Sequence, residues 1–319
     1  MAQAEDIFLR TKHRTFRGLT EDIEHEWTGP FYFIQAADPQ LGLMKAQREG
    51  DCDGGGDEWT EEVDLTKQAV AAMNQLRPRP RFMVLCGDLV HAMPGTIFRD
   101  DQERDLKMAL SGTDPSIPLV FVSGNHDLGN TPTPKTVAQY CSAWGDDYFS
   151  FWVGGVLFLV LNSQLFYDAS ACPQLKESQE TWLEEQLSKI SFSSSTAPKH
   201  IIVFQHIPLY IKNHDEEDDY FNLQREVRQK LIDRFKKAAV VAGHTTDSWE
   251  NKECRMPGDP SSRGREDIHL FGIITTGLLL IGVSVALVCR QIESCWQPSK
   301  YHKDATNDWR MQEELWTIL

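Results

Sequence analysis

Short apolar runs alternate with amphipathic stretches along most of the chain. Buried strands give apolar runs, and helices that cover a sheet show apolar residues three or four positions apart. The runs predict strands at residues 31–38, 82–88, 117–127, 144–164 (two strands meeting at Gly154–Gly155), 200–209 and 240–241. The amphipathic stretches predict helices at 59–73, 99–110, 177–190 and 225–238. Because strand and helix alternate, the sequence predicts a layered α/β fold.

The composition changes at both ends of this pattern. Residues 1–30 are polar and mixed, and we expect a loosely held N-terminal arm. Residues 31–247 carry the alternation and form the predicted catalytic domain. Residues 248–269 are charged and rich in Pro, Gly and Ser, which indicates a linker. An apolar segment at 270–289 and a polar tail at 290–319 complete the chain.

The segment 270–289 contains no charged residue, and its length matches a membrane-spanning helix. Its β-branched residues fit equally well two buried strands that meet at Thr275–Thr276–Gly277. Lys and Arg flank both sides similarly, so they predict no orientation. Two interpretations stay open: a helix that anchors a cytoplasmic catalytic domain to a membrane, or two strands.

Charge and cysteine content restrict the class of partner. The 47 acidic and 32 basic residues give a net charge of −15, which argues against a nucleic-acid or anionic-membrane surface. A phosphorylated substrate is still compatible, because metal ions can supply local positive charge. Seven scattered cysteines without a Cys-x-x-Cys motif indicate a reducing compartment, and the N-terminus has no apolar signal sequence. The sequence does not indicate whether the protein is a monomer or an oligomer.

Five apolar runs end in residues that can bind metal: Asp38, Asp88, Asn125–His126–Asp127, His206 and His244. A single strand-terminal Asp is usually a turn former, and a single His is usually structural. In layered α/β proteins, however, ligands bind at the carboxyl ends of the strands. The mixture of carboxylates, an amide and imidazoles suits Mn²⁺, Fe²⁺ or Zn²⁺, with Mg²⁺ also possible, and does not suit a thiolate site. The five positions together predict one metal site.

Such a site has a defined chemistry. A carboxylate can bridge two divalent ions placed about 3.5–4 Å apart, and a shared water then ionises near neutral pH. The resulting metal-bridging hydroxide attacks phosphorus in line, and an imidazole protonates the departing oxygen. The sequence contains no Gly-x-x-x-x-Gly-Lys-Ser/Thr loop and no competing nucleophile motif. These residues therefore predict metal-dependent hydrolysis of a phosphate ester, with a phosphomonoester as the main prediction and a phosphodiester as a further alternative.

The order of the motifs resembles the calcineurin-like metallophosphoesterases: Asp-x-Gln at 38–40, Gly-Asp at 87–88, Gly-Asn-His-Asp at 124–127, His206 and Gly-His at 243–244. The resemblance runs from about residue 27 to 244, with specific strings such as "SGNHDLGNTPT" and "IVFQHIPL". It implies a four-layer α/β/β/α sandwich and a cytosolic serine/threonine phosphatase that acts on phosphorylated proteins. Because it ends at His244, strands that complete the second sheet would be missing or replaced.

The resemblance also implies a role for each matching residue. Asp88 would bridge two metals, with Asp38 on the first metal and three further ligands on the second: Asn125, His206 and His244. His126 would face the phosphate or the leaving group. His126, Asp127 of the same motif and His91 are the candidate catalytic residues.

Three positions depart from the family pattern. Gln40 stands where many members have His, and it offers only a neutral amide oxygen. His91 stands where many members have an Asp that orients the catalytic His. Thr246 replaces the second His of Gly-His-x-His, and Asp247 is the nearby substitute. The alternative function is therefore a scaffold or binding protein with an impaired first metal site.

Two acidic stretches have simpler interpretations. Residues 51–62 place Asp51, Asp53, Gly56 and Glu62 at the spacing of a calcium loop, but no helix is evident before them. We therefore expect a loop near the active site rather than a calcium site. Residues 214–220 are expected to be a solvated acidic loop, which could also repel acidic substrates.

Overall fold

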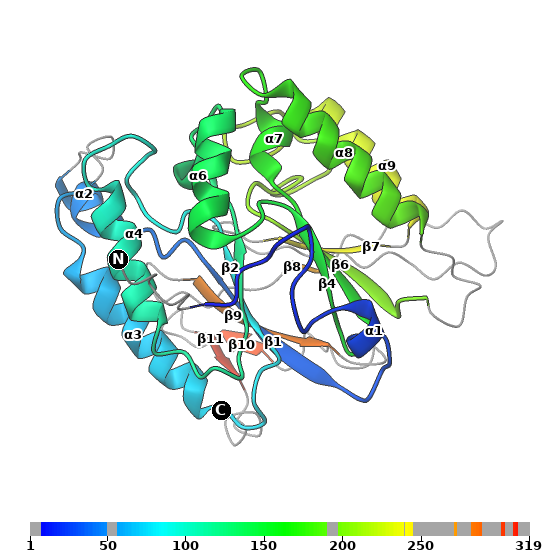
Figure 1. The fold of residues 1–319 in the computed structure, drawn as a ribbon, viewed down its shortest axis with the longest axis horizontal. Coiled ribbons are helices and arrows are strands. Elements are labelled where there is room, and N and C mark those ends of the chain that lie inside the picture. The colour runs from blue at the N-terminus through cyan, green and yellow to red at the C-terminus, as the bar shows by residue number, and fades with distance from the viewer. Residues whose placement is uncertain are drawn as a thin grey trace.

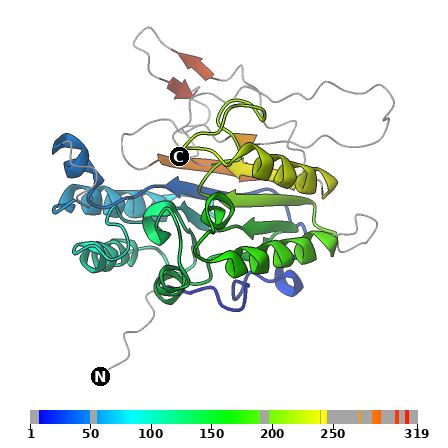
Figure 2. The ribbon, with the colours of Figure 1, turned by 90° about the horizontal axis from the view of Figure 1, so that it is seen from above.

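The chain forms two β-sheets that lie between two groups of helices. The computed structural model describes residues 8–49, 56–189 and 197–238, and the strand segments 240–244, 271–272, 282–288, 301–303 and 309–311. Figure 1 shows α3 and α4 on one side of the strands and α8 and α9 on the other, and Figure 2 gives the view from above. The predicted layered α/β fold is confirmed for the described residues.

The first sheet has the strand order β3-β2-β1-β9. Three of its strands are parallel: β1 (Phe31–Ala37), β2 (Met83–Cys86) and β3 (Leu119–Val122). They read as continuous apolar runs because helices and the second sheet cover both faces. β9 (Gly282–Val288) pairs antiparallel with β1.

The second sheet has the order β4-β5-β6-β7-β8. Its strands are β4 (Phe149–Val153), β5 (Val156–Val160), β6 (His200–Gln205), β7 (Val240–His244) and β8 (Phe271–Gly272). Gly154 and Gly155 have φ angles of 54° and 81°, which the tight hairpin turn between β4 and β5 requires. A separate pair joins β10 (Tyr301–Lys303) to β11 (Trp309–Met311).

The helices cover the outer faces of the sheets. They are α1 (Glu21–Glu24), α2 (Leu43–Glu49), α3 (Thr60–Gln75), α4 (Arg99–Leu110), α5 (Asn125–Leu128), α6 (Pro134–Trp144), α7 (Ser163–Tyr167), α8 (Pro173–Ser188) and α9 (Arg225–Lys237). The four predicted helices are present, within a few residues of their expected ends. Helix α6 was not predicted, although Thr133 caps it by accepting a hydrogen bond from the Thr136 N–H, and Pro134 follows.

Phenylalanine rings fill the space between the sheets. Phe33 stacks on Phe82 with ring centroids 4.6 Å apart, and Phe158 stacks on Phe204 at 5.8 Å. Phe82 also meets Phe151 edge to face at 5.1 Å. These rings come from both sheets, so their packing sets how the two sheets lie against each other.

The N-terminal arm corrects one expectation. Residues 8–30 pack against the domain instead of being loosely held, and Phe16 is only 1% exposed. Arg14 donates a 2.6 Å hydrogen bond to the Asp147 carboxylate and lies over the Tyr148 ring. A few apolar residues within a polar stretch are enough to hold it, because Phe16 and Leu19 join the core between the sheets.

The apolar segment 270–289 is described only at 271–272 and 282–288, and both pieces are strands. β9 pairs with β1 over its full length, from Phe31↔Val288 to Ala37↔Gly282. No helix in the described part of the chain is long and apolar enough to cross a membrane. The strand interpretation therefore holds where the segment is described. The linker 248–269 lies outside the described residues, and so does most of the tail.

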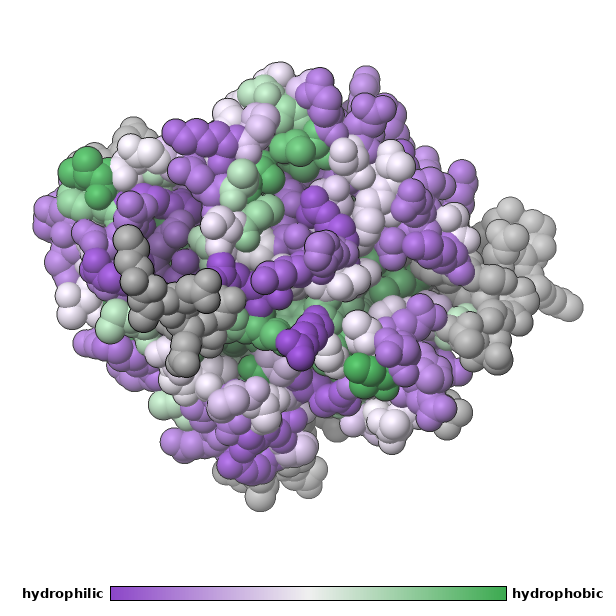
Figure 3. All heavy atoms as spheres, in the orientation of Figure 1, coloured by the Kyte–Doolittle hydropathy of each residue, from purple (hydrophilic) through white to green (hydrophobic). Residues whose placement is uncertain are grey.

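The visible face of the molecule is mostly hydrophilic, with apolar residues in small patches (Figure 3). This agrees with the strongly acidic composition. Ile97, Tyr220 and Phe221 are among the described apolar or aromatic residues that are more than half exposed. The last two lie at the site described next.

Candidate metal centre

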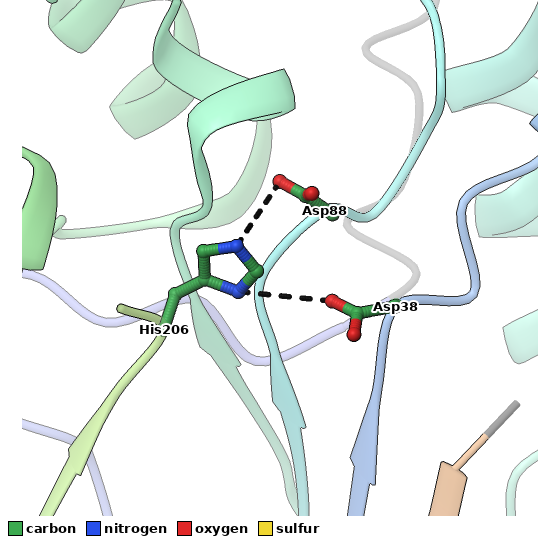
Figure 4. Close-up of side chains that lie close together, drawn as sticks. All are labelled: Asp38, Asp88 and His206. Carbon is green, nitrogen blue, oxygen red and sulfur yellow. Dashed lines mark ion pairs between the residues drawn. The ribbon is translucent and has the colours of Figure 1, made fainter. Parts of the chain in front are cut away.

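Three predicted ligands converge at the carboxyl ends of the strands. Asp38 follows β1, Asp88 follows β2 and His206 follows β6, and their side chains point toward one another (Figure 4). The Asp38 Oδ1 lies 3.7 Å from His206 Nδ1, and the Asp88 Oδ1 lies 3.5 Å from His206 Nε2. One ligand atom from each lies within 4.8 Å of the others. Both sheets therefore contribute to one potential cation site.

The backbone at this point is unusual. Asp38 and Asp88 have positive φ angles of 50° and 46°, a conformation that costs free energy in residues other than glycine and is often found at functional sites. The two turns support each other, because the Asp38 N–H donates to the Gly87 carbonyl. Gly87 has a φ of 74°, and a Cβ there would lie 2.1 Å from His206 Nδ1. The Gly-Asp motif thus leaves space for the imidazole.

The surroundings of His206 fit a metal ligand. Its Nδ1 lies 3.2 Å from the Cys86 carbonyl oxygen. When the Nδ1–H donates a hydrogen bond to this carbonyl, the lone pair of Nε2 faces Asp88 Oδ1 and Asn125 Oδ1. Asn125 Oδ1 lies 3.2 Å from Nε2. Metal-binding histidines commonly donate their second N–H in this way. Three electron-rich atoms then face one another, an arrangement that a cation stabilises. Burial lowers the pKa of His206, but Asp88 and Asp38 raise it further, so the net pKa is raised.

Asp127 lies beneath the site rather than in it. Its fully buried carboxylate accepts hydrogen bonds from the N–H groups of Leu89 (3.1 Å) and Gly124 (2.8 Å). It therefore ties the turn after Asp88 to the turn before Asn125. Burial raises the pKa of Asp127 to about 7, with Arg99 opposing this shift and Asp88 adding to it. Asp127 was predicted as a catalytic residue, and in the structure its carboxylate is buried and hydrogen-bonded to these two turns.

The two candidate catalytic histidines lie side by side. Their rings stack with centroids 5.0 Å apart, and the His126 Nδ1 contacts the His91 carbonyl oxygen. The His126 backbone N–H donates to Asp88 Oδ1 at 2.8 Å. His126 lines the cavity over the site, whereas His91 is 2% exposed and lies behind it. The contact that orients His126 comes from the backbone of residue 91, where the family pattern has a carboxylate.

A cavity of about 400 Å³ opens over these residues. The polar part of its lining includes the predicted residues Asp38, Gln40, Asp88, Asn125, His126 and His206. Aromatic and aliphatic side chains complete much of the rest: Tyr167, Ile207, Pro208, Ile211, Tyr220 and Phe221. Asn130 and Gln164 also line it. Asn130, Gln164 and Tyr220 were not among the predicted site residues, although Asn130 stands only five residues after Asn125.

Two further sequence predictions are only partly described. His244 ends β7, and its backbone pairs in register with Gln205, next to His206, whereas its side chain and residues 246 and 247 lie outside the described part. Residues 51–55, which belong to the stretch with the spacing of a calcium loop, also lie outside the described part of the chain. Glu62 is buried, and its Oε1 accepts hydrogen bonds from the N–H groups of Gly42 and Met44. This carboxylate therefore holds the start of α2.

Comparison with known proteins defines the class. The family model of the calcineurin-like phosphoesterases matches residues 33–247, and the chain belongs to this family. The serine/threonine-protein phosphatase CPPED1 of Danio rerio is 68% identical over 247 residues, which cover 76% of this chain and 79% of the relative. The Homo sapiens protein of the same name is 57% identical over 247 residues, which cover 76% of this chain and 78% of that protein.

A solved structure of the purple acid phosphatase PPD1 from yellow lupin is also similar. The match covers 69% of this chain and 38% of the lupin chain, with 13% sequence identity and a TM-score of 0.47. This similarity adds nothing to the family assignment, which rests on the family model and the sequence relatives. The resemblance inferred from the motifs is confirmed.

Proposed function

We propose that this protein is a metal-dependent phosphomonoesterase that removes phosphate from phosphoserine and phosphothreonine in proteins. The observation that carries the proposal is the convergence of Asp38, Asp88 and His206 at the edge of the two sheets. Support comes from the 68% identity to a serine/threonine-protein phosphatase. The catalytic domain would span residues 31–247 and form a four-layer α/β/β/α sandwich. The N-terminal arm would pack against this domain.

The ligand set supports two divalent ions, with Mn²⁺, Fe²⁺ and Zn²⁺ preferred and Mg²⁺ also compatible. Asp88 would bind both ions. Asp38 and Gln40 would bind one ion, and three residues would bind the other: Asn125, His206 and His244. Such ions, when bound, supply positive charge to phosphoryl oxygens and lower the pKa of a water molecule. The protein holds the ligands in place through the turns at Gly87 and Gly124, where a Cβ would meet His206 or Asp88.

His126 supplies the proton chemistry. Its Nδ1 contacts the His91 carbonyl, so an N–H at Nδ1 donates there and Nε2 is the atom that can carry a proton to the leaving oxygen. The hydrogen bond from its backbone N–H to Asp88 fixes where this ring stands relative to the site. A serine or threonine side chain would leave as an alcohol after it accepts this proton.

Asp88→Asn tests the proposal. With Mn²⁺ present, hydrolysis of a phosphoserine peptide should fall by at least about 100-fold, because a bridging carboxylate becomes a neutral amide. Metal content of the purified protein should fall with it. Asp64→Asn, an exposed substitution on α3, is the matched control and should keep both. Full hydrolysis by Asp88→Asn would contradict the proposal, as would a wild-type protein that binds no divalent ion.

The alternative function, a scaffold protein, rests on Thr246, because the family pattern has a metal-binding His at that position. If the first metal site is impaired, Thr246→His should raise Mn²⁺-dependent turnover at least about 10-fold, as expected for a restored ligand. Equal turnover in both proteins would show that Thr246 does not limit the activity. No turnover by either, with Mn²⁺ in excess, would favour the scaffold.

A further inference from the structure

The amide of Asn125 has polar partners on both of its ends. Its Oδ1 faces the site, 3.2 Å from His206 Nε2. Its Nδ2 donates to Asn130 Oδ1 at 3.2 Å and to the Tyr220 hydroxyl at 3.0 Å. The Tyr220 hydroxyl in turn lies 3.5 Å from Asn130 Oδ1, so the three side chains form a closed group.

This group determines which end of the amide faces the cation site. An asparagine amide has one acceptor oxygen and two N–H donors of nearly the same shape, so it can occupy its site in two orientations. In the observed orientation both N–H groups have acceptors, and the oxygen points at the site. In the reverse orientation the oxygen of Asn125 would face the oxygen of Asn130, and N–H groups would face the cation. The two acceptors therefore favour the orientation that a cation requires.

Both acceptors are held by other parts of the fold. The backbone carbonyl of Asn130 accepts a hydrogen bond from Gln164 Nε2 at 2.7 Å. Tyr220 comes from the loop that follows His206, and its ring packs edge to face on Phe221 with centroids 5.1 Å apart. Tyr220 and Phe221 both line the cavity. Metal ligands whose outer partners are removed typically lose about 10–100-fold in affinity.

We propose that Tyr220 and Asn130 are positioning residues that set the orientation of the Asn125 amide and so raise the affinity of this site for a divalent cation. The inference rests on the proposed function, since it assigns Asn125 Oδ1 to the metal. It extends that function to two residues outside the predicted set of site residues. The loop that carries Tyr220 also supplies other side chains that line the cavity, so the metal site depends on how this loop is placed.

Direct titration of Mn²⁺ into the metal-free full-length protein tests this without substrate. Tyr220→Phe removes only the hydroxyl, and Asn130→Ala removes the second acceptor, so each should weaken Mn²⁺ binding about 10-fold. Asn130→Asp keeps an acceptor oxygen and should retain the affinity. In turnover assays, Tyr220→Phe should need more Mn²⁺ for half-maximal rate but recover most of kcat when Mn²⁺ is saturating.

Tyr32→Phe is the matched control. It removes a hydroxyl bonded to the Pro78 carbonyl at the far end of β1, and its Mn²⁺ affinity should equal that of the wild type. Thermal unfolding of the metal-free variants shows whether Tyr220→Phe has damaged the fold instead. If the wild type and Tyr32→Phe bind Mn²⁺ and a folded Tyr220→Phe binds equally well, the inference is wrong and the proposed function stands. If none of the three binds Mn²⁺, the proposed function fails with it.

Discussion

Individual residues at the site depend on backbone conformations that most side chains avoid. Asp38, Gln40 and Asp88 all have positive φ angles, and each lies in a turn directly beyond a strand. The free-energy cost of these conformations is of order 1–3 kcal/mol per residue and is sustained by the surrounding packing. Their common result is that carboxylates from separate strands point to one location. This explains why the turn residues matter as much as the ligands.

Asp127 should give the metal-free protein a pH-dependent stability. Its pKa is about 7 when folded and near 3.8 when unfolded, so between these values the folded state holds a proton that the unfolded chain has lost. The contribution of Asp127 to stability is therefore greatest at low pH and falls as pH rises toward about 7. His206, whose folded pKa is also raised, acts in the same direction.

Urea unfolding in EDTA at pH 5 and pH 8 measures this effect. The wild type should lose more stability between the two pH values than Asp127→Asn, in which this group no longer titrates. His206 should leave a residual slope in both proteins. Identical losses in the two proteins would show that Asp127 does not carry a proton near neutral pH in the folded state.

At the scale of elements, the loop between β6 and α9 joins the site to the helix layer. Arg228 on α9 is fully buried and donates hydrogen bonds to the carbonyls of Leu209 (3.4 Å) and Glu216 (2.6 Å). The Glu216 carboxylate accepts three backbone N–H groups of the same loop, from residues 211 to 213. The acidic stretch 214–220 is exposed at every position except Glu216, as expected of a solvated loop, and Glu216 anchors it inward.

Arg228→Ala should destabilise the protein by about 3 kcal/mol, because buried carbonyls and the Glu216 carboxylate lose their partner. Arg225→Ala on the same helix is the matched control. Arg225 is half exposed and pairs with an exposed Glu217, so its loss should cost less than about 1 kcal/mol. Chemical denaturation measures both values. Comparable losses in the two variants would contradict the anchoring role of Arg228.

At the scale of the whole molecule, the aromatic core determines where the two sheets meet. Phe82 is 0% exposed and contacts rings from both sheets, including Phe33, Phe151 and Phe158. The candidate ligands Asp38 and Asp88 follow strands of the first sheet, and His206 follows a strand of the second. Packing of the core therefore controls the distances between these three side chains.

Phe82→Ala should lower the free energy of unfolding by about 3–5 kcal/mol, as expected when a large ring leaves a cavity in a core. Phe221→Ala, at an exposed position, should change it by less than about 0.5 kcal/mol. Urea denaturation followed by tryptophan fluorescence gives both values. A small loss in Phe82→Ala would show that neighbouring rings can close the gap.

The sequence alone determined the layered α/β class and which strand-end residues would lie together. Apolar runs marked the strands because buried strands must be apolar, and the residues after them were expected to meet because strand ends share one edge. Gln40, Asn125 and His126 reach the cavity together with Asp38, Asp88 and His206. The family followed from the spacing of the same motifs.

The tertiary structure decided what local pattern cannot encode. It placed Asp127 and His91 behind the cavity although their motifs are adjacent to the ligands, because the turns direct their side chains inward. It brought Tyr220 to Asn125 and Asn130, from which it is 95 and 90 residues away in the sequence, and packed residues 8–30 of the N-terminal arm onto the domain. These contacts arise from packing between distant segments. Periodicity reports only which face of an element is buried, and does not specify the partner that covers it.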